Sequence, residues 1–320
     1  MSLKRVYLDQ RDWIKLARQH YGVDHDDGVA GVLAMVREAS KAGHASFPLS
    51  SAHYVETYHQ RDPGRRQRLG AFMAEISRFH AIATAPDLLD AELHVALCHL
   101  AGVEPSHQPV PFGRGARHAF GKSMAPSYFS DPERERQAIA YFGEEAVFKF
   151  FETALITGPD QQLPANGIAL PSREFAQRQL DFERDTARRI REWGHTSDRA
   201  HRLVLTQEAA GMLDQLNRAA EAIRFDMRPV LNSGEAMKAF MLSLPAKGNV
   251  CRLRMSAHEN QNFRWQIGDL SDMTALATAA GYCDVVVAER QWGSILRRHA
   301  ADLRAQVTSN LLDLPKLLVT

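Results

Sequence analysis

Residues 282–290 read Tyr-Cys-Asp-Val-Val-Val-Ala-Glu-Arg, and the apolar run in their middle is typical of a strand buried on both faces. Such strands belong to parallel sheets that helices cover on either side. The stretch Val6-Tyr7-Leu8-Asp9 has the same form, because a short apolar strand again ends at an acidic residue. We therefore expect the strands of Asp9 and Glu289, from opposite ends of the chain, to lie in one parallel sheet.

Helical patterns alternate with strand-like segments around these two stretches. After the first, apolar residues at helical spacing predict a helix over 29–36, residues 45–49 read as a second strand, and 50–51 supply an N-cap. Before the second, Asp272 is expected to open a helix, and beyond it Val307 is expected to begin a last strand or an extended tail. This alternation predicts an α/β fold with a central parallel sheet.

The middle of the chain has long helical patterns, Pro- and Gly-rich interruptions and few strand signals. Residues 103–131 are expected to form an irregular connector, and 173–192 an exposed helix of mixed charge. Alternating polarity at 250–255 favours a strand. We therefore divide the chain into a discontinuous core, 1–84 and 266–320, and a mainly helical insertion, 85–265.

The insertion is expected to pack against the core, because its helices carry apolar faces that need burial. These faces are Leu93, Leu97 and Leu100 in one helix, and Leu213, Leu216 and Ile223 in another.

Composition narrows the class of protein. The chain has 320 residues, 45% of them hydrophobic, and 39 basic against 38 acidic residues give a net charge of +1. This balance excludes a protein-wide basic field and leaves nucleic-acid binding to a local patch. The three cysteines form no C-x-x-C pair, which argues against a disulfide framework and a structural zinc site. Without a signal peptide or an apolar stretch long enough to span a membrane, we expect a cytoplasmic protein with no membrane partner.

Three weaker motifs each have a more ordinary explanation. Residues 116–123 fit a permissive P-loop pattern, but a Pro- and Gly-rich stretch precedes them, so a flexible loop is favoured over a nucleotide site. His94 and His99 flank Cys98 without a third metal ligand, which favours packed or exposed histidines over zinc. The arginine-rich helix 173–192 also carries acids, so a solvated face is favoured over a groove for RNA phosphates.

Four acidic residues occupy positions that meet at one edge of a parallel sheet. Asp9 and Glu289 end their strands, Glu56 lies about one turn into the helix after the second strand, and Asp272 begins its helix. Strand carboxyl ends and the following helix starts share one edge, where α/β proteins bind their ligands. Clustered carboxylates repel each other and need a counter-ion, for which Mg²⁺ or Mn²⁺ is suited. For two of these acids a purely structural role remains open as an alternative to a metal site. Asp272 is then the N-cap of its helix, and Asp9 is a turn residue.

These motifs together resemble the PIN-domain nucleases. The similarity lies in Val6-Tyr7-Leu8-Asp9, in Leu49-Ser50-Ser51 with Glu56, in Asp269-Leu-Ser-Asp272-Met and in residues 282–290, where large PIN-like proteins have a Tyr-Cys-Asp strand leading to a second acid. It covers residues 1–80 and 266–320. The resemblance implies a PIN-like α/β/α sandwich whose acids gather Mg²⁺ or Mn²⁺ and cleave RNA. Because the family includes toxins and phage-defence proteins, an antitoxin, a defence partner and a second copy of the chain are candidate partners besides RNA.

The resemblance assigns catalysis and metal binding to four acids, with a fifth as alternate ligand, and phosphate contacts to two arginines. The four acids are Asp9, Glu56, Asp272 and Glu289, the alternate ligand is Asp269, and the two arginines are Arg11 and Arg290. Glu289 departs from the family pattern, in which the last acid is usually Asp. Asp284 is not assigned to the site, because a strand advancing about 3.3 Å per residue places it about 16 Å from Glu289, at the opposite edge.

Three other functions remain open. A phosphatase of the haloacid-dehalogenase type needs a second Asp two residues after the first, but Arg11 stands there. A structure-specific DNA nuclease would share the same sheet and acids. A catalytically inactive PIN-like RNA-binding or scaffold protein is supported by the departure at Glu289. Dependence on a divalent metal separates the nucleases from the scaffold.

Overall fold

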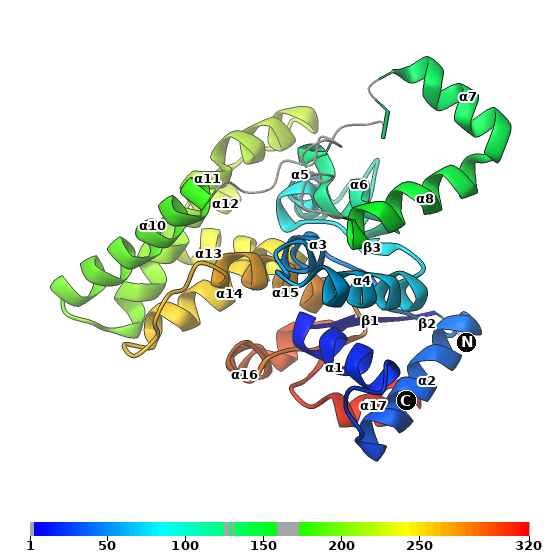
Figure 1. Ribbon diagram of the computed structural model, residues 1–320. Coiled ribbons are helices and arrows are strands. Elements are labelled where there is room, and N and C mark those ends of the chain that lie inside the picture. The colour runs from blue at the N-terminus through cyan, green and yellow to red at the C-terminus, as the bar shows by residue number, and fades with distance from the viewer. Residues whose placement is uncertain (1–2, 125–127, 130, 159–172, 320) are drawn as a thin grey trace.

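The computed structural model describes residues 3–124, 128–129, 131–158 and 173–319. Its central feature is a four-stranded parallel sheet with the order β2-β1-β5-β6. Two of these strands, β1 and β2, are labelled in Figure 1. The strands are β1 (Lys4–Leu8), β2 (Ala45–Ser46), β5 (Val285–Val287) and β6 (Gln306–Thr308). Val6 pairs with Val285 and Leu8 with Val287, so the prediction that both chain ends share one parallel sheet is confirmed.

Helices of the two chain ends surround this sheet. They are α1 (Gln10–His20), α2 (Asp27–Lys41), α3 (Ser51–Tyr58), α4 (Pro63–Ser77), α15 (Asp269–Tyr282), α16 (Arg290–Arg298) and α17 (Leu314–Val319), with short 3-10 turns η2 (Ala300–Asp302) and η3 (Leu311–Asp313). Val6 and Leu8 pack with Trp13 of α1, whereas Tyr7 packs with Leu276 of α15. Alternate side chains of β1 therefore face two different apolar layers, which explains its unbroken apolar sequence.

A small second sheet extends the row of strands. β3 (His80–Ile82) pairs antiparallel with β4 (Phe112–Arg114), and Leu49 forms a parallel bridge to Ala81. Together with the helix α6 (Gly115–Phe120) and the 3-10 turn η1 (Gly121–Ser123), β4 lies inside residues 103–131. The prediction of an irregular connector there is therefore wrong for residues 112–123.

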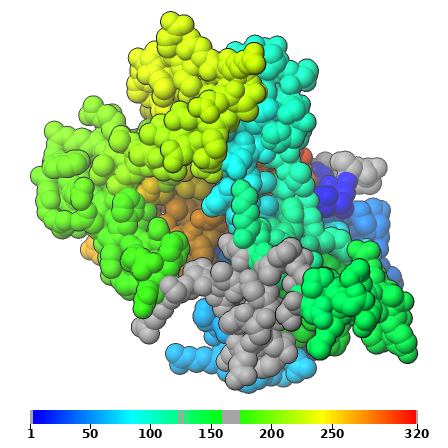
Figure 2. All heavy atoms as spheres, turned by 90° about the horizontal axis from the view of Figure 1, so that it is seen from above, coloured from blue at the N-terminus to red at the C-terminus, as the bar shows by residue number. Residues whose placement is uncertain are grey.

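The rest of the middle region is helical, as predicted. Its helices are α5 (Ala85–Ala101), α7 (Pro132–Phe142), α8 (Glu144–Thr157), α10 (Arg173–Glu192), α11 (Ser197–Ala222), α12 (Arg228–Leu231), α13 (Gly234–Ser243) and α14 (Pro245–Glu259). Seen from above, α7 and α8 lie on one side of the molecule and α10 to α13 on another, with α5 and α6 between them (Figure 2). No helix in the described residues has the length and apolar character that crossing a bilayer requires.

The strand predicted at 250–255 is wrong, because these residues lie in α14. Every residue from Cys251 to His258 is buried, including Arg252 and Arg254. A helix that is buried on all sides lacks the polar stripe by which helical periodicity is recognised. The alternating polarity that favoured a strand at these residues is therefore accidental.

The insertion packs against the core, as expected. Leu155 and Ile156 of α8 belong to the apolar cluster of α4, and the backbone of Gly281 in α15 approaches Pro245 at the start of α14. The expected apolar faces were only partly right. Leu93, Leu97 and Leu216 are buried and Ile223 is half-buried, but Leu100 and Leu213 are 55% and 41% exposed.

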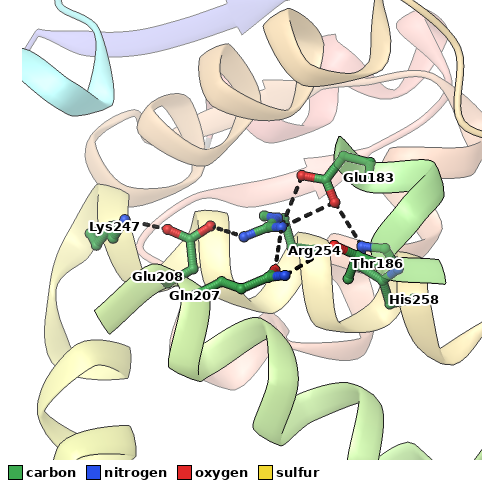
Figure 3. Close-up of polar contacts among 7 residues, drawn as sticks. All are labelled: Glu183, Thr186, Gln207, Glu208, Lys247, Arg254 and His258. Carbon is green, nitrogen blue, oxygen red and sulfur yellow. Dashed lines mark hydrogen bonds and ion pairs between the residues drawn. The ribbon is translucent and has the colours of Figure 1, made fainter. Parts of the chain in front are cut away.

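The helix α10 is less exposed than predicted, because one of its faces contributes to a buried polar network (Figure 3). Glu183 of α10 accepts hydrogen bonds from Arg254 at 3.0 Å and contacts His258 at 2.7 Å, both on α14. On α11, Gln207 donates to Thr186 of α10 at 3.0 Å, and Glu208 pairs with both Arg254 and Lys247. The network fastens α10 and α11 to α14.

Candidate active site at the carboxyl edge of the sheet

Two of the predicted acids leave adjacent strands at the same edge. Asp9 follows β1 and Glu289 stands two residues beyond the end of β5, and each is the N-cap residue of the next helix. The Asp9 N–H donates to the carbonyl of Val287 at 3.0 Å, and the Asp9 carboxylate accepts the Arg11 N–H at 3.1 Å. The parallel register of β1 and β5 therefore places both acids at one edge.

The other acids come from helices that contact each other, α3 and α15. Glu56 lies on α3, while Asp269 and Asp272 lie in the first turn of α15. The expectation that Asp272 opens its helix is wrong by one turn, because α15 begins at Asp269. The Asp269 carboxylate accepts the N–H of Gln266 at 2.6 Å. Asp269 therefore makes the local contact at the start of α15, and Asp272 is not the N-cap of this helix.

The charges of these acids act on one another. Loss of hydration, and then the charges of Asp272, Asp9 and Glu289, raise the pKa of Glu56 to about 8 although part of the residue is exposed. Loss of hydration, and then Asp9, Asp269 and Glu289, raise the pKa of Asp272 to about 7. Burial, followed by the charge of Glu289 among the raising causes, also raises the pKa of Asp9. The structure therefore brings all five predicted acids within electrostatic range.

The carboxylates nevertheless stand apart. In the described part of the chain, no three His, Cys, Asp or Glu side chains are close enough to hold a metal ion between them. Binding of a cation by this edge would require the acidic side chains to turn towards each other.

One further acid at this edge was missed by the sequence reasoning. Asp12 is buried, and loss of hydration raises its pKa to about 6; Arg11 opposes this rise, and the charge of Asp9 adds to it. Its carboxylate lies 3.5 Å from the guanidinium of Arg11. Asp12 is three residues after Asp9, so the i,i+3 neighbourhood on α1 is the signal that could have identified it.

A buried histidine fixes α3 against the end of β1. The Ser50 N–H donates to Nδ1 of His53 at 2.9 Å, which leaves Nε2 to donate to the carbonyl of Leu8 at 2.9 Å. Burial lowers the pKa of His53 to about 4, so the ring is neutral. Ser50 was expected as an N-cap, but its partner His53, three residues later, was not recognised.

The two predicted phosphate contacts flank the acids in sequence and are accessible. Arg11 and Arg290 are both exposed, at the starts of α1 and α16. Arg11 also approaches Asp12, so part of its charge is already compensated.

Asp284 lies at the opposite edge, as expected. Its carboxylate accepts the backbone N–H of Arg5 at 2.7 Å and a guanidinium hydrogen bond from Arg304 at 3.3 Å. It therefore joins the beginnings of β5 and β1.

The weaker motifs do not form sites. Residues 116–123 lie in α6 and η1, so neither a phosphate loop nor the flexible loop favoured from sequence is present. Nε2 of His94 accepts the Ser106 N–H at 3.1 Å, and its ring stacks on His107 with centroids 4.1 Å apart. His94 is thus a packed histidine.

Comparisons of the chain with family models, with curated proteins and with solved structures found no match.

Proposed function

We propose that this protein is a divalent-metal-dependent endoribonuclease with a PIN-like core, acting in the cytoplasm as a toxin or phage-defence effector. The observation that carries the proposal is the set of acids at the carboxyl edge of the sheet, which raise one another's pKa. Acids held together at a cost in repulsion favour a role that uses their charge.

The chemistry of the donor set suits Mg²⁺ or Mn²⁺, although in the described residues the acidic side chains must turn towards each other to share one ion. It consists of carboxylates on α3 and α15 and at the turns that follow β1 and β5, and these are the hard oxygen ligands that these cations prefer. Asp9, Glu56 and Asp272 would hold the cation, with Glu289 and Asp269 beside them. A bound cation supplies charge neutralisation and Lewis acidity for phosphodiester hydrolysis.

The protein's own groups have separate tasks in this reaction. Arg11 and Arg290 orient the phosphate through charge-assisted hydrogen bonds. A carboxylate of the cluster accepts a proton from the attacking water, whose oxygen bonds to phosphorus while the ester P–O bond breaks and the leaving oxygen takes up a proton.

The test compares an RNA and a DNA oligonucleotide of the same sequence, with Mn²⁺ or with EDTA. We expect RNA cleavage that needs Mn²⁺ and is lost in Asp9→Asn. Asp284→Asn is the matched control, since it neutralises an acid of the same sheet at the other edge. It should retain cleavage while its unfolding free energy falls by about 1–3 kcal/mol, the cost of weakening charged hydrogen bonds.

Other results would point elsewhere. Metal-dependent cleavage of DNA alone would favour the DNA nuclease. Metal-independent RNA binding without cleavage would favour the inactive scaffold. Equal degradation of RNA by wild type and Asp9→Asn would mean a contaminating nuclease and would refute the proposal. Growth arrest on expression of wild type, but not of Asp9→Asn, would support the toxin role.

A further inference from the structure

The edge of the sheet opposite the acids carries basic residues in fixed positions. Arg5 of β1 pairs in register with Ser46 of β2, and His80 of β3 pairs with Arg114 of β4. Ser46 Oγ lies 2.7 Å from Nδ1 of His80 and so links the two pairs of strands. With Phe112 and Gly113, these four residues line a cavity of about 220 Å³, here called the amino-edge pocket.

Arg5 gives this pocket a positive charge without a carboxylate partner. Its guanidinium lies over the ring of Phe112, with Cζ 4.8 Å from the centroid. Among the described residues, no acid lies within ion-pairing distance of this guanidinium, although the Arg5 backbone N–H donates to Asp284. A guanidinium that stacks on an aromatic face keeps its N–H groups free at the edge.

The surroundings of the pocket retain a surplus of positive charge. Arg114 is paired with Glu145, which Lys149 also contacts, and lies within reach of the charge of Glu152, while Arg304 is paired with Asp284. Arg5 is additional to these pairs, and its charge reaches His80. Burial, and then the charges of Arg5, Arg114 and Arg78, lower the pKa of that ring. The imidazole is thus neutral at pH 7 and offers hydrogen bonds.

We propose that the amino-edge pocket binds the phosphate group of a small phosphomonoester. The guanidinium of Arg5, the hydroxyl of Ser46 and the imidazole of His80 come from three different strands of the lining, and Arg114 lies beside them in its ion pair with Glu145. This set of donors suits a tetrahedral oxyanion better than a planar carboxylate. The volume equals the share of about seven water molecules, so it holds more than a bare phosphate. The site is independent of the nuclease proposal.

The test titrates the full chain in EDTA, without divalent metal, with inorganic phosphate, ribose 5-phosphate and sulfate. We expect one saturable site by calorimetry, with ribose 5-phosphate bound more tightly than phosphate. Arg5→Gln should weaken both by at least about tenfold, the effect of one lost charged hydrogen bond. Arg5→Lys should weaken them less, because it keeps the charge.

Arg18→Gln is the matched control, since it removes an exposed arginine of α1 that pairs with Asp24 outside the pocket. It should bind as wild type, and thermal melts should show that all variants fold. Equal binding by Arg5→Gln and Arg18→Gln would overturn the proposal. So would sulfate binding as tightly as ribose 5-phosphate, or absence of saturation by about 10 mM. Loss of RNA cleavage in Asp9→Asn would leave this result untouched.

Discussion

Asp9, Glu56, Asp269, Asp272 and Glu289 stand at one edge of the sheet, and the charges of all but Glu56 oppose the ionisation of a neighbouring acid. Without a cation, the folded state is relieved when some of them hold protons. Stability and function are therefore linked through the same residues, and this link can be measured without any substrate.

Glu56 and Asp272 make the metal-free protein less stable as pH rises from 6.5 to 8. Their pKa values of about 8 and 7 in the folded state exceed the ordinary 4.5 and 3.8, so the folded protein binds protons that the unfolded chain has released. The free energy of unfolding falls until pH passes these values. His53, with its pKa lowered to about 4, acts oppositely, but only below about pH 6.5.

Thermal melts at pH 6.5 and 8 in EDTA test this prediction. After allowance for solvent screening at the exposed Glu56, we expect the free energy of unfolding to be lower at pH 8 than at pH 6.5 by on the order of 1 kcal/mol. The melting temperature should fall by about 2–4 °C. Glu56→Gln should reduce this difference in stability between the two pH values. Addition of Mn²⁺ at pH 8 should restore the stability that is lost there. Identical pH profiles for wild type and Glu56→Gln would show that the acids do not repel.

Variants of Glu289 test whether a negative charge at this position serves the proposed reaction. Glu289→Gln removes the charge and should lower kcat/KM for RNA at least about tenfold at a fixed Mn²⁺ concentration. Glu289→Asp keeps the charge on a shorter side chain and should retain most activity. If Gln and Asp are equally active, the charge at this position has no part in the reaction.

The edge of the sheet at which a residue lies could be predicted wherever that residue directly precedes or closely follows a strand. Asp9 and Glu289 follow buried strands, so their edge was determined, and Asp284 was excluded by the same argument. Asp12 could not be placed in this way, because its burial depends on how α1 lies on the sheet. The linkage of Ser50, His53 and Leu8 likewise needs the packing of α3 against β1, which no local pattern contains.

At the scale of elements, α10 is held against α14 by charged contacts on a helix that the sequence analysis predicted to be exposed to solvent. Arg188 and Arg189 do lie on the exposed face, where Asp185 and Glu192 pair with them. This favours the solvated face over a groove for RNA phosphates at these positions. Glu183, on the other face, is buried with Arg254. Periodicity separates apolar from polar faces, and it fails where a polar face is buried.

Arg254→Met should lower the free energy of unfolding by about 3–5 kcal/mol, because it leaves the buried Glu183 and Glu208 without their shared partner. Arg188→Met is the matched control, the same substitution at an exposed ion pair of α10, and should cost less than about 1 kcal/mol. Urea unfolding gives both values. Adding Glu183→Gln and Glu208→Gln to Arg254→Met should recover part of the loss, whereas equal losses in the two single variants would mean that the network contributes little.

At the scale of the whole molecule, the sheet is charged with opposite sign at its two edges. Arg5 is the second residue of β1 and Asp9 follows the end of this strand, about 13 Å away for four residues of extended chain. The net charge of +1 conceals this polarity, since composition sums what topology separates. The sequence could predict the acidic edge, but the basic edge needed the unforeseen pairing of β3 with β4.

The pairing of β1 with β5 also has a consequence for biosynthesis. β1 leaves the ribosome before β5, and β5 with Glu289 follows about 280 residues later. At roughly 5–20 residues per second, this delay lasts roughly 15 to 55 s. During translation the nascent chain holds only part of the acidic edge. Under the proposed function, the chain would therefore gain its complete set of acids, and with it the ability to cleave RNA, only after Glu289 has been translated.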